Sequence, residues 1–546
     1  MSLLSSARVM AVGTVASRAT GFLRTAVLAA VLGVASVGDA FNVANTAPNI
    51  VYELLLGGIL TSVVVPLLVR ASRDGVEQGR AYAQRLLTLT LFGLGGAVLL
   101  LVLAAPLLIG VYQRSGTPTY DLAVLLARFF LPQVLFYGLG AVMGAWLNTQ
   151  GVYGAPMWAP VLNNLVVVAT GLLFLLVPGP ARLTAGTITP TQTTVLGVGV
   201  TLGILVQTLA LVPSLRATGL SLRPRFDLRG TGLRQAGRLA RWTGVFVVGN
   251  QVSIAVVVRL AGGHGVEGRG YTAYVSAFVL WQLPHAVVAV SLITALLPAM
   301  SRAAADGRTD ELRRRLDEGL RLSVSILVPA AVALVVLGRP VSVLVFAHGR
   351  TTGDQARFIG DVLAVMAVGL VAFSAYQLQA RAFYALQDTR TPALVNLAVN
   401  GSAIVVDLVL YAVLPPDLTV LGLAAGQSGS YLLGAALCTR VLARRVPHDP
   451  AGHVLRTTVR CLLAATLPAL GALLVVVLAD RVAGHGLLAT LAGGGLGGAV
   501  LVGGYVALAR RVRVPEVAVL IDPVLSRLGT RRWPARLKPS GRYADS

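Results

Sequence analysis

The sequence predicts an all-α polytopic membrane protein with about fourteen transmembrane helices. Of its 546 residues, 55% are hydrophobic and only 12% are charged. The apolar residues form runs long enough to cross a bilayer core of about 30 Å. The 45 Arg and Lys residues flank these runs rather than forming a separate basic domain. This composition excludes a large soluble domain.

Fourteen apolar runs meet the length requirement. They lie near residues 9–32, 40–69, 86–111, 121–147, 157–178, 193–215, 239–261, 271–300, 320–346, 357–386, 393–414, 418–439, 457–480 and 486–509. If the connections alternate between the two sides, 34 basic residues fall on the side of the N-terminus, 8 on the other side and 3 within spans. The positive-inside rule then places both termini in the cytoplasm.

A weak internal repeat divides these spans into two sets. The repeated positions are Pro66 and Arg70 with Pro298 and Arg302, and Pro156 and Asn164 with Pro392 and Asn400. The offset equals six spans, so the copies share one orientation and are related by a pseudo-two-fold axis along the membrane normal. We therefore expect six-helix lobes at 1–216 and 217–445, two further helices within 446–510, and a basic cytoplasmic tail at 511–546.

The first predicted span contains two arginines, Arg18 and Arg24. A guanidinium keeps its proton, so inside a bilayer it needs water, a counter-ion or an anionic ligand. With a rise of about 1.5 Å per residue, Arg18 lies near the midplane and Arg24 about 9 Å further along. A buried cationic binding site is the leading hypothesis. Pairing of these arginines with Asp39 and Glu53 as contacts between helices is the alternative.

Several segments carry a family resemblance. They are Ser17-Arg18-Ala-Thr-Gly21-Phe22-Leu-Arg24, Gly38-Asp39-Ala40-Phe41, Ala47-Pro48-Asn49, Leu297-Pro298-Ala-Met-Ser301-Arg302 and Tyr384-Ala-Leu-Gln-Asp388-Thr-Arg-Thr-Pro392. They resemble the MurJ/MviN family of lipid II flippases, within the multidrug/oligosaccharidyl-lipid/polysaccharide exporter superfamily. The resemblance implies fourteen helices, two six-helix lobes around a central cationic cavity, and a last helix pair that forms a groove for a polyprenyl tail.

The resemblance also implies a substrate site. Arg18, Arg24 and Asp39 match functional residues of the family, Asp39 being suited to hold an arginine while the cavity is empty. Ser17 and Asn49 stand in the matching segments and complete this part of the candidate set.

The chain departs from the family pattern twice. A basic residue is expected after Pro48-Asn49, where the chain reads Ile50-Val51-Tyr52-Glu53, and an Ala-Asp-Arg where it reads Ala277-Phe278-Val279. Arg259 is either a third cation of the site or an interfacial anchor. Glu53 either neutralises an arginine or binds a cation or proton, and both roles stay open.

Other polar residues in the spans have competing interpretations. Asp407 either binds a coupling cation or contacts a neighbouring helix or water, and His285 either carries protons or is structural. Arg128 is expected to extend toward the outer surface. The remaining residues are expected to bond between helices or to cap one, and they are Asn163, Asn164, Asn400 and Asp388.

Several chemistries are excluded by composition. Lys538 is the only lysine, so the chain has no phosphate-binding loop of the Gly-Lys-Ser/Thr type and no cofactor is expected. Cys438 and Cys461 lack metal-ligand and redox spacing and are expected to be buried thiols. No catalytic residues are assigned, and no nucleic acid is expected because the basic residues lack interleaved aromatics. A membrane glycosyltransferase or acyltransferase would need an acidic or histidine cluster on a large loop.

The sequence therefore predicts a carrier of lipid II, or of a close polyprenyl-diphosphate glycolipid, that works by alternating access. The alternatives are an exporter of another lipid-linked glycan and a non-transporting scaffold of cell division. The expected partners are the glycolipid, anionic membrane lipids at the basic tail, and the cell-wall synthesis machinery.

Overall fold

A computed structural model describes residues 3–53, 68–69, 71, 75–227, 233–445, 450–484, 486–512, 514 and 516–517. Side chains are described from residue 12 onward within these ranges, except at 51, 233–240, 450, 451 and 483. The predicted tail at 511–546 lies almost wholly outside the described residues, and so do Pro66 and Arg70 of the repeat.

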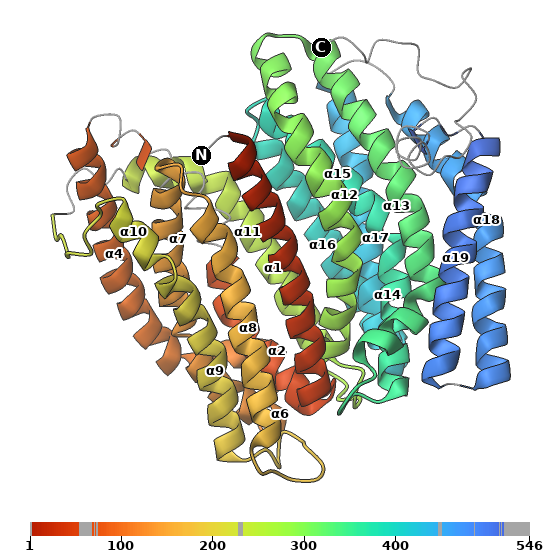
Figure 1. The fold of residues 1–546 in the computed structure, drawn as a ribbon, viewed down its shortest axis with the longest axis horizontal. Helices are drawn as coiled ribbons and strands as arrows, with labels where there is room; N and C mark the ends of the chain where they lie inside the picture. Colours follow the sequence, from red (N-terminus) through yellow and green to blue (C-terminus); the bar gives the residue numbers. More distant parts are fainter. Residues whose placement is uncertain are drawn as a thin grey trace. The chain divides into compact units, whose positions relative to one another are not determined.

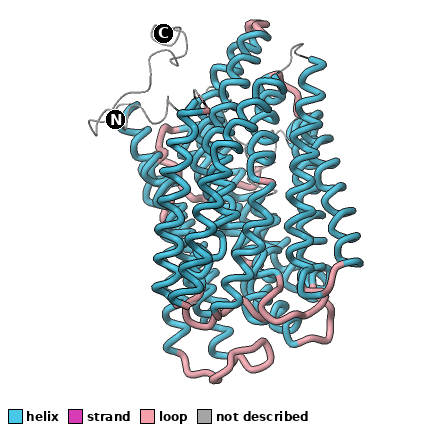
Figure 2. The backbone as a smooth tube through the Cα atoms, turned by 90° about the vertical axis from the view of Figure 1, so that its right-hand side faces the viewer, coloured by secondary structure: helices cyan, strands magenta, loops and turns pink. Residues whose placement is uncertain are grey.

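The described chain is all helix and connections, with no strand (Figure 2). Twelve helices are long and apolar enough to cross a membrane, and a thirteenth span is added if the bent pair α14 and α15 is counted as one. The all-α polytopic class is therefore confirmed, whereas the count of fourteen is not. The remaining predicted span, 40–69, begins in a described helix and continues into residues 54–67, outside the description.

The chain packs as two compact units. One consists of Met1–Thr272 with the short segment His348–Thr352, and the other of Ala273–Ala347 with Gly353–Ser546. This division follows packing, whereas the lobes expected at 1–216 and 217–445 follow a sequence repeat. The lobes, their symmetry axis and the separate helix pair therefore remain predictions.

The first unit is a bundle of helices (Figure 1). Its described helices are α1 (Leu3–Leu32), α2 (Ser36–Glu53), α4 (Val76–Leu103), α5 (Ala105–Tyr112), α6 (Pro118–Phe130), α7 (Gln133–Thr149), α8 (Gly154–Leu176), α9 (Pro190–Leu209), α10 (Val212–Ala217), α11 (Leu233–Ala261) and the first residues of α12 (Tyr271–Ala305). Residues in the first turn of a helix can specify where that helix begins. Thr189 and Gln192 form a reciprocal capping box at α9, with Pro190 in the first turn.

Small and polar residues let the helices of the first unit approach closely. In Figure 1 α1 runs beside α8, where the side chain of Asn164 faces Gly21. A Cβ at Gly203 on α9 would lie 2.4 Å from Oδ1 of Asn163, so only glycine fits there. The core around α2 and α6 is apolar and includes Phe41 against Phe130, whose ring centroids are 5.4 Å apart.

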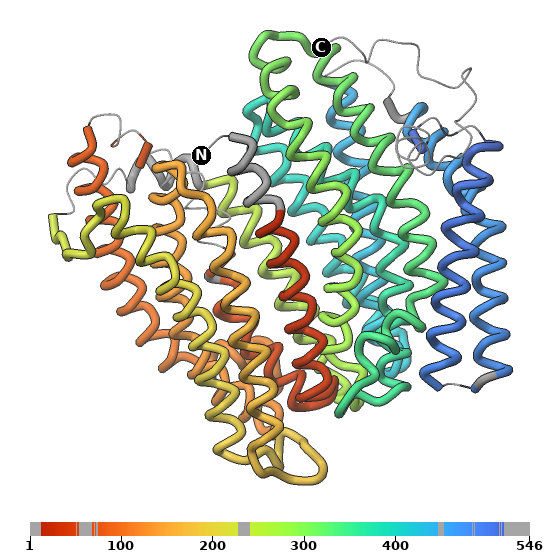
Figure 3. Tube along the Cα trace, in the orientation of Figure 1, coloured from red at the N-terminus to blue at the C-terminus, as the bar shows by residue number. Residues whose placement is uncertain are grey.

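The second unit is also a helix bundle. It contains the rest of α12 and helices α13 (Thr309–Phe346), α14 (Gly353–Val368), α15 (Leu370–Ala385), α16 (Arg390–Val413), the 3₁₀ turn η2 (Pro416–Leu418), α17 (Thr419–Arg445), α18 (Pro450–Ala483) and α19 (Leu487–Arg511). Figure 3 shows α18 and α19 as a hairpin in blue. A Cβ added at Gly493 would lie 3.2 Å from α18 and one at Gly504 would lie 2.9 Å from it, so these glycines let the two helices pack closely.

The bend between α14 and α15 is stabilised by α17. The two helices meet at Gly369 with an angle of 47°. Ser428 Oγ donates to the carbonyls of Val365 and Met366, at 3.0 Å and 3.3 Å, near the break in the helical ladder. A Cβ at Gly369 would lie 2.7 Å from the Cα of Ser428. The bend is therefore built into the packing of α17.

Two local predictions are confirmed in the second unit. Cys438 and Cys461 are free and buried. Asp388 accepts a hydrogen bond from the backbone N–H of Thr391, in the first turn of α16, so it caps that helix as expected. Burial opposes the charged form of Asp388, but hydrogen bonds from Thr391 and Arg445 outweigh it and lower the pKa of this carboxyl.

Helices α16 and α17 pack around a buried carboxylate. Asp407 is only 1% exposed, and a Cβ at Gly426 would lie 2.1 Å from its Oδ1. Gly429, three residues further along α17, has open space at the same position. The two glycines therefore differ in whether a methyl group can be accommodated.

We predict that Gly426→Ala lowers the free energy of unfolding in detergent by about 1–3 kcal/mol, because the added methyl group overlaps a buried carboxylate. Gly429→Ala is the matched control on the same helix, and it should stabilise the protein slightly because alanine is the better helix former. Thermal unfolding of both variants tests this. Equal melting temperatures would contradict the packing described for α16 and α17.

Candidate substrate-binding site

All seven predicted site residues belong to the first unit. Ser17, Arg18 and Arg24 lie on α1, Asp39, Asn49 and Glu53 on α2, and Arg259 on the last turn of α11. Arg24, Glu53 and the side chains around them on α2, α7 and α11 form a polar cluster.

Arg24 is the central feature of this region. Its side chain is partly exposed, and within the described structure it makes no ion pair and no hydrogen bond. The phenol of Tyr137, on α7, lies within electrostatic range of the guanidinium. Arg18 is exposed on α1 and likewise has no ion pair among the described residues. Arg24 is therefore a permanent charge in an apolar helix with its donors available to a ligand.

Helix α1 is held in place by α8. Asn164 Nδ2 donates to the backbone carbonyl of Ser17 at 3.2 Å and to Oγ1 of Thr20 at 3.0 Å. The expected bonding of Asn164 between helices is thus confirmed, and the backbone of Ser17 is part of that contact. Asn400 Nδ2 donates to the carbonyl of Asn396 within α16, and its expected bonding between helices remains a prediction.

Helix α2 contains an internal proline, Pro48. Proline has no N–H, so the carbonyl of Ala44 loses its normal partner four residues later, and the helix is weakened at this turn. Thr46 Oγ1 donates to the carbonyl of Asn42 one turn earlier. Asn49, which follows the proline, is exposed.

The N-terminal part of α2 is bound to the start of α12. Asp39 Oδ1 accepts the backbone N–H of Thr272 at 2.7 Å, and Asn42 Nδ2 donates to Thr272 Oγ1 at 3.1 Å. A Cβ at Gly270 would lie 2.1 Å from Asp39 Oδ2. Thr272 is the second residue of α12, so Asp39 satisfies a donor that the helix itself leaves unpaired. The structure gives Asp39 this partner and not an arginine.

The C-terminal end of the described α2 faces α11. Glu53 is exposed and accepts a hydrogen bond from Gln251 Nε2 at 2.8 Å. The ring of Tyr52 packs on that of Tyr137, with centroids 4.5 Å apart. The alternative in which Asp39 and Glu53 neutralise the two arginines is therefore not what the structure shows, since each carboxylate has a different partner.

Arg259 stands apart from this cluster. It is exposed, and it forms no hydrogen bond or ion pair with any residue that the structure describes. Arg128, on the last turn of α6, is also exposed. The structure does not bring Arg259 into contact with Arg24, so its assignment to the site remains a prediction.

Three residues of the polar cluster were not predicted from the sequence. They are Tyr137, Gln251 and Tyr271, the last of which is hydrogen-bonded to Thr46 and in electrostatic range of Glu53. Polar aromatic residues and amides are common in membrane helices, so none of these positions carries a signal by itself. Only their convergence on α2 identifies them.

The other embedded groups of interest lie in the second unit. His285 Nδ1 is 2.8 Å from Ser374 Oγ and the ring packs on Phe373, which fits the structural alternative. Asp407 Oδ1 has no hydrogen-bond partner among the described residues. No cluster of three metal-ligating side chains occurs in the described parts of the chain. A cation at Asp407 therefore remains a prediction.

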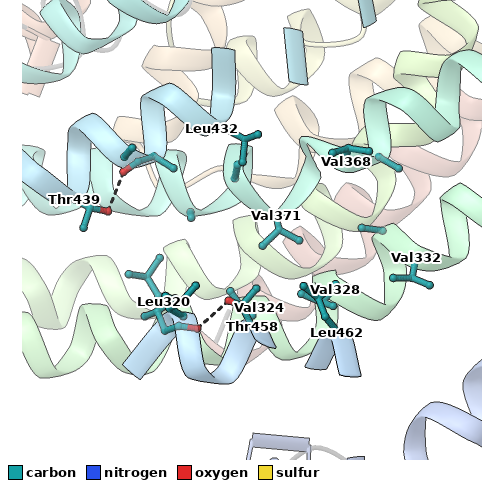
Figure 4. A pocket seen from close by; sticks show the side chains of 18 of the residues that line it. Leu320, Val324, Val328, Val332, Val368, Val371, Leu432, Thr439, Thr458 and Leu462 are labelled. Atoms are coloured by element: carbon teal, nitrogen blue, oxygen red, sulfur yellow. Dashed lines mark hydrogen bonds between the residues drawn. The ribbon is translucent and has the colours of Figure 1, made fainter. Parts of the chain in front are cut away.

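The second unit contains a long apolar pocket. Its volume is about 720 Å³, and it is lined by α13, α14, α15, α17 and α18. Figure 4 shows side chains such as Leu320, Val371 and Leu462 around it. The polar lining residues are Gln379, Thr439 and Thr458, and Gln379 and Thr439 are hydrogen-bonded to each other at 2.6 Å. Of the two helices expected to form a lipid groove, α18 lines this pocket and α19 does not.

A family model described as "Lipid II flippase MurJ" matches residues 28–492 of the chain. The chain belongs to this family. A member from Rhizobium meliloti (strain 1021), described as a probable lipid II flippase MurJ, is 28% identical over 458 residues and covers 81% of each chain. The Lipid II flippase MurJ of Burkholderia cenocepacia is 28% identical over 420 residues, covering 74% of this chain and 76% of its own.

Solved structures support the fold of this MurJ family member. A structure titled "Lipid II flippase MurJ, inward closed conformation" matches with a TM-score of 0.73 at 19% identity, covering 94% of this chain and 99% of its own. An inward-facing multidrug resistance MATE family transporter of the MOP superfamily matches with a TM-score of 0.64 at 14% identity, covering 79% and 94%. The predicted family and the multi-pass membrane class are thus confirmed.

The contacts of Asp39 and Arg24 predict opposite effects on stability. Asp39→Ala leaves the N–H of Thr272 unpaired and should lower the free energy of unfolding by about 2 kcal/mol. Arg24→Ala should leave it unchanged or raise it slightly, because no protein partner is lost. Thermal unfolding in detergent compares the two variants, and a larger loss for Arg24→Ala would refute this assignment of roles.

Proposed function

We propose that this protein moves lipid II from the inner to the outer leaflet of the cytoplasmic membrane. The match of residues 28–492 to the lipid II flippase family is the observation that carries the proposal. The unpaired guanidinium of Arg24 supports it independently, because a cation held in an apolar helix without a protein counter-ion is suited to an anionic ligand.

The ligand group that fits Arg18 and Arg24 is the diphosphate of the carrier lipid. A guanidinium presents a planar fork of donors that binds two phosphate oxygens at once, and such charge-assisted bonds are strong where water is scarce. Arg259, Ser17 and Asn49 remain proposed members of the same site. Asp39 acts through the packing of α2, since its carboxylate is bonded to Thr272.

The apolar pocket of the second unit is suited to the polyprenyl tail. An isoprenoid chain has no hydrogen-bonding groups, and burial of apolar surface contributes about 25 cal/mol per Å². The pocket is lined almost wholly by Val, Leu and Ala, and it includes α18, one of the two helices expected to form the groove. A tail bound there contributes affinity without any specific polar contact.

The proposed transport cycle is alternating access between two lobes, with no covalent chemistry. Both termini lie in the cytoplasm on this proposal, as the distribution of basic residues favours. The cycle draws on an ion gradient, the membrane potential, or removal of the product outside. One charge moved through 100 mV corresponds to about 2.3 kcal/mol. The cell-wall synthesis machinery that consumes the product is the proposed partner outside the membrane.

Rescue of a bacterium depleted of its own lipid II flippase tests the role of the arginines. We expect the wild-type chain to rescue growth, and Arg18→Ala and Arg24→Ala to fail or to lose at least about tenfold in flipping rate, because charge-assisted bonds to phosphate are lost. Membrane abundance of each variant is the control. Rescue by both variants would contradict the binding mechanism and favour a non-transporting scaffold.

Filling the apolar pocket tests the proposed tail site. Ala436→Phe, on the lining of the pocket, should weaken binding of a long polyprenyl diphosphate about tenfold and leave a short-chain analogue unaffected. Leu433→Phe is the control, because Leu433 lies on the same helix outside the lining. Equal effects on the long and short lipids would rule out the pocket as the tail site.

A further inference from the structure

Glu53 on α2 and Gln251 on α11 form a hydrogen-bonded pair next to Tyr52, whose ring packs on Tyr137. Glu53 is exposed and has no cationic partner among the described residues. Its only hydrogen bond in that part of the chain is from Gln251 Nε2, at 2.8 Å. A neutral amide leaves the charge of the carboxylate uncompensated.

The orientation of the Gln251 amide follows from its partner. An ionised carboxylate only accepts hydrogen bonds, so Gln251 must turn its NH₂ group toward Glu53. Its Oε1 then points elsewhere, and this atom is buried without a hydrogen-bond partner in the described structure. Gln251 itself is 9% exposed. A buried amide oxygen without a donor is costly, and a ligand that donates to it removes that cost.

Two opposite charges are held apart in this region. Arg24 is in electrostatic range of Tyr137, whose ring packs on Tyr52, the residue next to Glu53. Yet Arg24 and Glu53 do not form an ion pair, although their attraction is strong where water is scarce. Tyr52 and Tyr137 pack on each other between α2 and α7. The site therefore presents a cation and an anion separately.

We propose that Glu53 and Gln251 bind a primary ammonium group of the transported lipid, and so select a zwitterionic headgroup. This rests on the proposed function, in which Arg24 binds the diphosphate. An ammonium carries three donors, which match the Glu53 carboxylate and the free Gln251 oxygen. In lipid II the chemical source of such a group is a free side-chain amine of the peptide. A divalent metal fits poorly, because the site contains one carboxylate.

Transport by purified protein in vesicles tests this selectivity. The probes are lipid II whose peptide has a free side-chain amine, and the same lipid with that amine acetylated. Wild-type protein should transport the free-amine lipid about tenfold faster at subsaturating concentration. Glu53→Gln should abolish this preference by slowing the free-amine lipid alone. Gln251→Met, which keeps the side-chain length and removes the acceptor, should reduce it.

The control is Glu267→Gln, because Glu267 lies on an exposed loop and pairs with Arg182. It should leave the preference unchanged. Equal transport of both lipids by the wild-type protein would overturn the inference and leave the proposed function intact. An equal loss for both lipids in Glu53→Gln would also overturn it, and would indicate a proton or cation site instead. If neither lipid is transported by any form, the proposed function itself fails.

Discussion

The need to solvate a permanent charge inside an apolar bundle is the constraint on which the rest of this structure depends. Arg24 cannot lose its proton, and the described protein offers it no carboxylate and no carbonyl. The phenol of Tyr137 lies in electrostatic range of its guanidinium, and no acidic side chain of the described residues pairs with it. An arginine used only to join helices would be expected to pair with an acidic side chain. The acidic side chains of α2 have other partners, so Arg24 has no acidic partner among the described residues.

Helix α2 organises the first unit at both ends of its described length. At its N-terminal end Asp39 and Asn42 bind the start of α12, so a partly buried carboxylate is used to complete another helix. At its C-terminal end Glu53 accepts a hydrogen bond from Gln251, and Tyr52 packs on Tyr137. Pro48 lies between these two regions and interrupts the hydrogen-bond ladder. One helix thus combines a structural end, a weakened turn and an end that contributes to the candidate site.

The two units differ in the kind of ligand surface they present. The first contains charged and aromatic polar groups on α1, α2, α7 and α11, whereas the second contains an apolar pocket of about 720 Å³. An amphiphile with an anionic headgroup and a long hydrocarbon chain needs both kinds of surface. This agreement is independent of sequence similarity. It links the properties of each unit to the lipid-linked substrate proposed for the chain.

The sequence by itself determined the membrane class, thirteen of the predicted spans in outline, the cap at Asp388, and the family. These are local properties, because hydropathy and capping depend on residues within one helix or one turn. Only the tertiary structure decided the partners. Asp39 meets Thr272 and Glu53 meets Gln251 across about 200 residues of chain, and the apolar pocket combines five helices. Which side chains meet depends on how helices pack, and a polar residue in a span has several partners of equal chemistry until that packing selects one.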